Sequence, residues 1–342
     1  MSGDVIPEAR LRDCLAVTRR GLQLAGEAVV HVTREPGGLF NFVLRVETSG
    51  GVVFFKQYLD DVPNPTYNLP KIPASARAQL ACDVQRIAAD ATRSLGQDVV
   101  PEIIHFDDAR CAFLMAKAAG ERPLIDDLSA GQRPAAFVAR LPQALAMLHQ
   151  ATYHRFAPGS GYANTAFRDF KLGLQYDDVA RKLDPEEAAA VIRCKERYQQ
   201  RAECITHGDL NSRNIIIGSD TIGVIDFEQA HLGAPAYDLA YILCEVLISL
   251  ETAGAGKDAP AVFGEFLDHY FAWFDAATRA SVESEVTQHL AIQTLYRFWG
   301  PSRGSWTFYV DDASRTRLLA RARTLLMAQG PVSELLEECE VS

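Results

Sequence analysis

The sequence lacks any stretch long and apolar enough to cross a bilayer, and it has no paired-cysteine motif. Its longest apolar run, residues 236–250, is interrupted by Asp238 and Glu245, whereas a membrane-spanning helix needs about 20 apolar residues. The seven cysteines never form C-x-x-C, so neither a disulfide framework nor a zinc site is indicated. The first residues also lack the pattern of a signal peptide. We therefore expect a soluble, cytoplasmic protein without a membrane partner.

Positive charge is also in short supply. Only 34 lysines and arginines accompany 44 aspartates and glutamates, and the formal net charge is −10. A general nucleic-acid binder needs a basic face that releases counterions from phosphates, so we expect no nucleic-acid partner. Hydrophobic residues form 48% of the chain and charged residues 23%, which is ordinary for a globular protein. The length of 342 residues is enough for two lobes.

The first third of the chain has the alternation of antiparallel strands. Runs of β-branched and aromatic residues are separated by glycine-containing turns, and apolar residues at helical spacing flank them. The expected elements are a helix at 10–25, strands at 29–33, 42–48 and 52–58, a helix at 73–95, and strands at 101–106 and 111–116. Together they predict a five-stranded sheet with an accompanying helix.

Two features of this part suggest phosphate chemistry. The paired glycines Gly37 and Gly38 can bring backbone N–H groups close to phosphate oxygens, although a plain hairpin has the same pattern. Lys56, in the middle of a strand, is either a solvated side chain or a clamp for the inner phosphates of a nucleotide. A clamp needs an acidic partner, and the following helix offers Asp83 and Asp90. We prefer Asp83, which lies beside the apolar stripe of that helix.

The pattern changes after Met115. Residues 117–120 read as a linker, and most of the chain beyond them is helical. This predicts a nucleotide-binding lobe at 1–117 and a catalytic, acceptor-binding helical lobe at 118–342. Exposed backbone amides near Met115 and Lys117 would lie beside an apolar slot where a purine fits. The helices expected in the second lobe are at 134–152, 237–250, 262–274, 281–299 and 314–327.

The most informative stretch is residues 207–217. Asp209 and Asn214 are five residues apart, and Asp226 and Asp238 follow at intervals of twelve. These polar residues lie between runs of β-branched residues, so rigid strand ends hold them in place. Carboxylate and amide oxygens are the ligands that Mg²⁺ prefers. The stretch therefore predicts a loop for magnesium and phosphate chemistry.

This stretch resembles the aminoglycoside phosphotransferase and choline kinase group, relatives of the protein kinases. The resemblance covers about residues 30–245. It implies an α+β, protein-kinase-like fold of two lobes, with a five-stranded antiparallel sheet plus a helix in the first and a mainly helical second lobe. The residues that carry it are His207-Gly208-Asp209 with Asn214, Ile225-Asp226 with Gly233, and Asp238-Leu239-Ala240.

The resemblance also implies roles for individual residues. Asp209 would orient the hydroxyl of the acceptor and take its proton, which in a loose transition state is mainly a positioning task. The cofactors would be ATP and Mg²⁺. The other implied roles are metal binding by Asn214 and Asp226, nucleotide binding by Gly37, Gly38, Lys56, Asp83, Met115 and Lys117, and structural support by His207 and Asp238.

Departures from the protein-kinase pattern indicate the kind of acceptor. Gly208 replaces the arginine that holds a phosphorylated activation loop, and Glu228 stands where D-F-G has glycine. Only eleven residues separate Asp226 from Asp238, which leaves no room for a long peptide-docking loop. We therefore expect a small-molecule hydroxyl acceptor, whose candidate binding residues are Glu228, Arg297 and Trp299.

The charge of the acceptor stays open at this point. Arg297 and Arg303 favour a sugar, a carboxylate or a phosphate-bearing acceptor, whereas the acidic region 169–187 either favours an amine or is a solvated helical hairpin. We predict an ATP- and Mg²⁺-dependent phosphotransferase acting on a small metabolite or an aminoglycoside-like compound. The alternative is a catalytically weak nucleotide-binding regulator, while the short segment after Asp226 disfavours a protein kinase. The choice between ATP and GTP and the oligomeric state are open.

Overall fold

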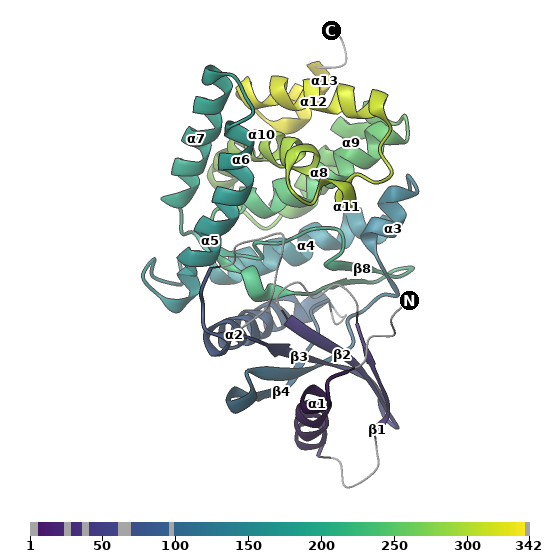
Figure 1. The fold of residues 1–342 in the computed structure, drawn as a ribbon. Helices are drawn as coiled ribbons and strands as arrows, with labels where there is room; N and C mark the ends of the chain where they lie inside the picture. The colour runs from purple at the N-terminus through teal and green to yellow at the C-terminus, as the bar shows by residue number, and fades with distance from the viewer. Residues whose placement is uncertain (1–5, 24–28, 36–40, 61–69, 96–98, 339–342) are drawn as a thin grey trace.

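The fold is described from a computed structural model of the chain that covers residues 6–23, 29–35, 41–60, 70–95 and 99–338. A five-stranded sheet with two helices lies at one end of the molecule, and a larger helical lobe lies at the other (Figure 1). This is the α+β, two-lobed architecture that the sequence predicted. The predicted Gly37-Gly38 turn lies outside the described residues.

The sheet has the order β1-β2-β3-β5-β4, and neighbouring strands are antiparallel. Lys56 lies opposite Val43 on one side and Phe113 on the other, so it belongs to the central strand. The five expected strands are confirmed with small shifts at their ends. They are β1 (Val29–Arg34), β2 (Asn41–Thr48), β3 (Gly51–Tyr58), β4 (Ile103–Asp107) and β5 (Ala112–Ala116).

Alternation along β3 gives the sheet two different faces. Phe55 faces helix α1 (Glu8–Gly21) and packs with Cys14 and Val17 of that helix. Tyr58 faces helix α2 (Ala74–Thr92) and packs against its alanines. Lys56 shares the face of Tyr58, because the two residues are two positions apart, and this face is turned toward the helical lobe.

Helix α2 contacts the sheet through a face of small residues, not through the stripe of larger apolar residues in its sequence. Ala78, Ala81 and Cys82 are buried against Tyr58 and Phe113. The larger apolar residues of the helix pack instead with the core of the helical lobe, where α2 lies beside α4. Small side chains let the helix approach the strands closely. The rotation that results decides where the acidic residues of α2 point.

The helical lobe is built around α8, whose residues 236–250 are all buried. None of the helices in the described ranges combines the length and the apolar character that crossing a bilayer would require. The helices expected from the sequence are present, and the structure adds further, mostly short helices that the sequence did not predict. The helices are α3 (Leu124–Ser129), α4 (Ala135–Thr152), α5 (Thr165–Leu172), α6 (Asp178–Ala180), α7 (Pro185–Gln199), α8 (Ala236–Thr252), α9 (Ala259–Phe271), α10 (Ala276–Trp299), α11 (Arg303–Trp306), α12 (Asp312–Met327) and α13 (Val332–Glu338).

Short strands of the helical lobe hold the predicted catalytic loop. Strand β7 (Cys204–Thr206) pairs with β10 (His231–Gly233), and β8 (Ile215–Ile217) lies between β6 (Arg122–Pro123) and β9 (Ile222–Val224). The loop therefore runs from β7 to β8, and the segment that carries Asp226 runs from β9 to β10. The two segments are tied together where the N–H of Ile225 donates to the carbonyl oxygen of Asn214 at 3.0 Å. The lobe boundary after residue 117 stays a prediction.

Candidate active site

The loop after β7 is shaped by a glycine at a position that has no room for a side chain. Gly208 has a φ of +76°, and a Cβ there would lie 2.1 Å from the carbonyl oxygen of Gln229. Both the backbone angle and the close approach require glycine. The arginine that protein kinases have at this position cannot be accommodated here, because the loop packs directly on the turn after Asp226.

Asp238, in the first turn of α8, holds the backbone of this loop. Its carboxylate accepts hydrogen bonds from the N–H groups of His207 at 2.6 Å and Gly208 at 3.1 Å, and it lies 3.2 Å from Nε2 of His149. Burial alone would raise the pKa of Asp238, but its interactions with His149 outweigh this effect and hold the pKa below its ordinary value. These contacts fit the supporting role predicted for Asp238.

His207 links the same loop to the segment of Asp226. Its Nε2 donates to the carbonyl oxygen of Ile225 at 2.9 Å, and its Nδ1 lies 3.3 Å from the N–H of Asp209. The imidazole ring also packs on Phe227, with the ring centroids 4.7 Å apart. His207 is fully buried. It therefore sits between the two chain segments that carry the candidate catalytic and metal-binding residues, as a supporting residue would.

Asp209 lies at the centre of a set of hydrogen-bond donors. Its Oδ1 accepts from Nζ of Lys171 at 2.7 Å and from the hydroxyl of Tyr241 at 2.9 Å. Its Oδ2 accepts from Nε2 of Gln229 at 3.2 Å and, at 3.5 Å, from Nδ2 of Asn214. Burial alone would raise the pKa of Asp209, but the charge of Lys171 outweighs it and lowers the pKa. Asp209 is thus an ionised, oriented carboxylate, as its predicted role requires.

Three of these donors were not predicted from the sequence. Tyr241 follows Asp238 by three residues on α8, and this spacing places both side chains on one face of the helix. The three-residue spacing could therefore have predicted from the sequence that Tyr241 faces the same loop as Asp238. Gln229 follows Asp226 by three residues in a turn, which gives a weaker signal. Lys171 lies on α5, 38 residues before Asp209, and no local pattern indicates it.

Lys56 reaches from the sheet to the helical lobe. Its Nζ lies 2.5 Å from Oδ1 of Asp226 and 5.3 Å from the ring centroid of Tyr58. Burial alone would lower the pKa of Lys56, but the charge of Asp226 outweighs it and the pKa is raised. Asp226 itself has a φ of 73°, an uncommon angle outside glycine. This turn aims its carboxylate at the sheet, so the two lobes meet in an ion pair.

The structure pairs Lys56 with neither of the acids predicted on α2. Asp83 accepts a hydrogen bond from Gln79 of the same helix at 2.8 Å. Asp90 is exposed and pairs with Arg93 at 2.5 Å. The reason is the alanine-rich face that α2 turns to the sheet, which carries both carboxylates away from β3. The structure thus pairs Lys56 with Asp226 instead of Asp83, and the nucleotide-binding role of Asp83 stays a prediction.

Oxygen atoms suited to a divalent cation gather where the two lobes meet. Nδ2 of Asn214 donates to the carbonyl oxygen of Asp209 at 2.9 Å, which leaves the amide oxygen as a candidate ligand. Glu228 is buried and accepts a hydrogen bond from Nδ2 of Asn41 on β2. Its burial and the nearby charge of Asp226 raise the pKa of Glu228 to about 7. Asp226 and Glu228 thus place two carboxylates near each other beside Lys56, and carboxylate oxygens are ligands that Mg²⁺ prefers.

Arg297, predicted to bind the acceptor, is buried behind the catalytic loop. Only 1% of its surface is exposed, and its Nη2 lies 2.6 Å from Oε1 of Glu245. Its guanidinium group lies between two rings, 4.7 Å from the centroid of Tyr241 and 4.6 Å from that of Trp306. Glu245 also accepts the N–H of Ser212 at 3.1 Å. Arg297 therefore supports the loop through Glu245, and its contacts do not fit the predicted acceptor role.

The other two predicted acceptor residues also lie elsewhere. Trp299 is partly buried on the core of the helical lobe, and its carbonyl oxygen accepts from Nζ of Lys182 at 2.7 Å. Glu228 faces Asn41 on strand β2 of the sheet lobe. The contacts of both residues therefore lend no support to an acceptor role, which stays a prediction for Trp299 and Glu228.

Two of the predicted nucleotide-binding residues flank the end of β5. Met115 is half-buried in the strand, and Nε2 of Gln85 lies 3.6 Å from its sulfur atom. Lys117 is exposed just beyond the strand. Both positions agree with the predicted nucleotide edge. The roles of Met115 and Lys117 stay predictions, as does that of the Gly37-Gly38 turn.

The acidic region 169–187 does not form a pocket of free carboxylates. Five of its acids are engaged by basic side chains of α5, α7, α12 and the segment between α6 and α7. The pairs are Asp169 with Arg168 at 3.1 Å, Asp177 with Lys195 at 2.6 Å, Asp178 with Lys182 at 2.7 Å, Asp184 with Arg323 at 3.1 Å and Glu187 with Arg323 at 2.6 Å. Of the two predicted readings, these pairs favour the solvated hairpin.

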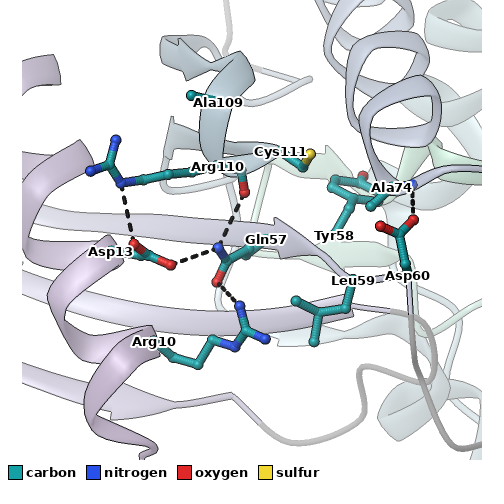
Figure 2. A pocket seen from close by; sticks show the side chains of 10 residues that line it. All are labelled: Arg10, Asp13, Gln57, Tyr58, Leu59, Asp60, Ala74, Ala109, Arg110 and Cys111. Carbon is teal, nitrogen blue, oxygen red and sulfur yellow. Dashed lines mark hydrogen bonds and ion pairs between the residues drawn. The ribbon is translucent and has the colours of Figure 1, made fainter.

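A hollow of about 600 Å³ lies away from this site, at the end of β3 on the α1 side of the sheet (Figure 2). Its charged and polar side chains bond to one another. Asp13 pairs with Arg110 at 3.2 Å and accepts from Gln57 at 3.0 Å, while Arg10 donates to Gln57 at 3.2 Å. None of the predicted site residues lines it. The candidate active site is therefore the junction of the lobes around Asp209 and Asp226.

Comparison with known proteins agrees with this placement. The model of the phosphotransferase enzyme family matches residues 27–282. Methylthioribose kinase 1 of Oryza sativa subsp. japonica is 25% identical over an alignment of 258 residues, and the match covers 66% of this chain and 58% of that protein. A methylthioribose kinase of Enterobacter sp. (strain 638) is 29% identical over 81 residues, 24% of this chain and 20% of that protein. The matches thus span less than two thirds of either relative.

Solved structures show the same fold at low identity. Choline kinase from Cryptosporidium parvum Iowa II has a TM-score of 0.58 at 13% identity and covers 95% of this chain and 99% of its own. An aminoglycoside phosphotransferase from Alicyclobacillus acidocaldarius has a TM-score of 0.53 at 15% identity and covers 100% and 98%. The predicted kinase-like fold is confirmed. Since the family model matches most of its length, the chain belongs to the phosphotransferase enzyme family.

Proposed function

We propose that the protein is a small-molecule kinase, which transfers the γ-phosphoryl group of ATP to a hydroxyl group of a small acceptor with the help of Mg²⁺. The observation that carries this proposal is the arrangement of Asp209. Its carboxylate is ionised, held by hydrogen-bond donors and still 18% exposed, next to the loop segment of Asp226 that meets Lys56. Membership of the phosphotransferase family supports it.

In this proposal each residue has one task. Asp209 orients the acceptor hydroxyl and receives its proton as the bond from the acceptor oxygen to the γ-phosphorus forms and the bond to the ADP oxygen breaks. Lys56 neutralises the inner phosphates. Asn214, Asp226 and Glu228 would hold Mg²⁺, which when bound neutralises charge on the outer phosphates. The lowered pKa of Asp209 is compatible with this task, because in a loose transition state the main requirement is that the acceptor hydroxyl is correctly oriented.

We further propose that the acceptor is neutral or anionic, with a sugar as the first candidate. Two cations lie close to this site: Lys171 is bonded to Asp209, and Arg297 lies over the ring of Tyr241. Five of the six carboxylates of region 169–187 are engaged by lysines and arginines. An amine would therefore meet like charge near Asp209, and most of the acids of region 169–187 already have a basic partner. Two relatives are named methylthioribose kinases, so methylthioribose is the first compound to test.

The proposal is tested by measuring ADP release with MgATP and a panel of acceptors. The panel contains methylthioribose, ribose, aminoglycosides, choline and ethanolamine, and MgGTP is run in parallel. We expect turnover with a sugar, and a decrease of about 10²–10⁴-fold in Asp209→Asn, the range for loss of a general base. MgATP binding by that variant, measured by calorimetry, should be unchanged.

The outcomes separate the hypotheses. MgATP binding without transfer to any acceptor would favour the nucleotide-binding regulator. Turnover with choline but with none of the sugars would contradict the proposed charge of the acceptor. An Asp209→Asn variant as fast as the wild type would remove Asp209 from the chemistry altogether.

A further inference from the structure

Lys171 is a buried cation at the reacting end of the site. It is only 7% exposed. Its Nζ lies 2.7 Å from Oδ1 of Asp209 and 3.1 Å from the hydroxyl of Tyr241. A buried lysine is costly unless it is paired and hydrogen-bonded, and Lys171 is both. Its charge therefore persists at this position, directly beside the carboxylate that would receive the acceptor.

The backbone around Lys171 holds it there. Helix α5 continues into a π-helical turn, η4 (Gly173–Asp177). Such turns are rare in proteins overall, but those that occur often lie at functional sites. The turn aligns Gln175 with Lys171, and Nε2 of Gln175 also reaches the hydroxyl of Tyr241, at 3.3 Å. Oε1 of Gln175 accepts from Tyr237 at 2.9 Å and from Gln293 at 2.8 Å. Gln175 thus ties this turn to α8 and α10, while Lys171 itself bonds to Tyr241 of α8.

The catalytic loop itself offers no other cation at Asp209. Gly208 has no room for a side chain, and Leu210 is buried in the core. The guanidinium group of Arg213 lies 4.4 Å from the ring centroid of Trp306 and donates to a backbone carbonyl of α11. Among the described residues of this loop, no lysine or arginine side chain bonds to the Asp209 carboxylate, and the nearby His207 contacts only its backbone N–H. The cation next to the Asp209 carboxylate is therefore Lys171, which comes from α5.

A cation at this place has a known physical effect on phosphoryl transfer. Negative charge in the transition state spreads over the three equatorial oxygens of the transferring group. An arginine that contacts these oxygens raises the rate by about 10³–10⁵-fold. A base lies about 2.6–3.2 Å from the acceptor oxygen, and that oxygen lies about 3–3.5 Å from the phosphorus. An ammonium group bonded to the other oxygen of the same carboxylate therefore lies within roughly 10 Å of the transferring group, close enough for its charge to act on that group through a water-poor site.

We propose that Lys171 supplies the cation of the phosphoryl-transfer step. It orients Asp209 through Oδ1, so that Oδ2 is presented to the acceptor, and its ammonium group stabilises the negative charge of the transferring phosphoryl group. Lys171 keeps its protons throughout. The acceptor's proton goes to Asp209, the oxygen–phosphorus bond to ADP breaks, and the bond to the acceptor forms. This inference rests on the proposed phosphotransferase function.

The test uses a mimic of the transferring group and needs no acceptor. MgADP with aluminium fluoride forms a planar, anionic substitute for the phosphoryl group in transit. Calorimetry measures the affinity of the full chain for MgADP alone and for MgADP with aluminium fluoride. We expect the fluoride to strengthen binding to the wild type. Lys171→Met should bind MgADP within about twofold of the wild type but lose at least about tenfold of the fluoride-dependent gain, as a lost charge-assisted contact predicts.

Two further substitutions keep the test decisive. Lys171→Arg retains the charge and should recover part of the gain, which a purely structural role does not predict. Lys171→Gln retains a hydrogen-bond donor for Asp209 without the charge, and it replaces Lys171→Met if that variant fails to fold. The matched control is Lys195→Met, which removes the ion pair of η4 with Asp177 at 2.6 Å without touching Asp209. Its gain should equal that of the wild type, and thermal unfolding verifies that each variant is folded.

Each result has one meaning. A full fluoride-dependent gain in Lys171→Met or Lys171→Gln overturns the inference and leaves Lys171 a structural residue. MgADP binding by the wild type without any fluoride-dependent gain overturns it too, while the proposed nucleotide site stands. Failure of the wild type to bind MgADP at all contradicts the proposed function, and the inference with it.

Discussion

Two lysine–aspartate pairs meet at the candidate site, and they are built differently. The intralobe pair, Lys171–Asp209, joins two elements of the helical lobe. The interlobe pair, Lys56–Asp226, joins the sheet to the helical lobe. The Asp209 side chain is 18% exposed and receives further hydrogen bonds from Tyr241 and Gln229. The Asp226 side chain is 32% exposed, and Lys56 is its ion-pair partner.

This difference indicates what each aspartate can do. A carboxylate that is surrounded by donors keeps its direction, because turning it would break several hydrogen bonds at once. A carboxylate with an open side and a cationic partner can take a metal ion on that side. The intralobe pair is therefore suited to orienting an acceptor, and the interlobe pair to binding Mg²⁺ and a nucleotide. The predictions below test whether the two pairs really have separate tasks.

Replacing the two aspartates one at a time should produce the largest and most distinct effects. Asp209→Asn should lower turnover by about 10²–10⁴-fold without weakening MgATP binding. Asp226→Asn should weaken Mg²⁺-dependent ATP binding by about 10–100-fold, as expected when a ligand shell is damaged. Calorimetry with MgATP, together with ADP release, separates the two phenotypes. Equal losses of binding in both variants would show that the pairs share one task.

Asp238 holds the backbone of the loop that carries Asp209, so its removal should cost stability. Asp238→Ala leaves two N–H groups of the loop and His149 without their acceptor, and we expect a loss of about 3–5 kcal/mol in the free energy of unfolding. Urea titration measures it. The control is Asp311→Ala, which removes a helix cap at α12 and should cost about 1 kcal/mol.

The pH dependence of this loss has a definite sign. The pKa of Asp238 is lowered in the folded protein, so its contribution is present above the ordinary aspartate value of about 4. The contribution is lost as the pH falls through the depressed folded value. The difference between wild type and Asp238→Ala should thus be constant between about pH 5 and 7 and shrink below about pH 4. A difference that grows on acidification would contradict the role given to Asp238.

Arg297 should affect the intralobe side indirectly. Arg297→Met leaves Glu245 buried without its cation, and we expect a loss of about 3 kcal/mol in the free energy of unfolding. The double variant Arg297→Met/Glu245→Gln should recover at least about 1 kcal/mol, because the unpaired charge is gone. The acceptor KM should change less than about threefold once the variant is folded. A large and selective increase in this KM would restore the acceptor role that the sequence predicted.

Asp83 should give the smallest effect. Asp83→Ala should change the free energy of unfolding by less than about 0.5 kcal/mol, as is usual for a surface position. It should also leave the MgATP affinity within about twofold of the wild type, like the control Asp90→Ala. A tenfold loss of affinity in Asp83→Ala alone would mean that Lys56 changes partner when nucleotide binds.

The sequence indicates three of the four residues of the two pairs, Lys56, Asp226 and Asp209, but it predicts neither pairing. Alternation along β3 places Lys56 on the inner face, and the spacing of Asp209, Asn214 and Asp226 reflects the strand–turn–strand that holds them. Lys171 was missed because its partner is far away in the chain and its position depends on how α5 packs. The face of α2 was misjudged for a related reason: close approach to the sheet selects small alanines, whereas sequence reading follows the larger apolar residues.

The close approach of Gly208 to Gln229 limits how this protein could be regulated by phosphorylation. An arginine introduced at position 208 would place its Cβ 2.1 Å from a carbonyl oxygen, so a single substitution cannot install the residue that reads a phosphorylated activation loop. The loop and the turn after Asp226 would have to separate together, and the candidate metal ligands would move with them. A designer who wants a phosphorylation-gated version of this protein should therefore fuse the sensor to the outside of the helical lobe.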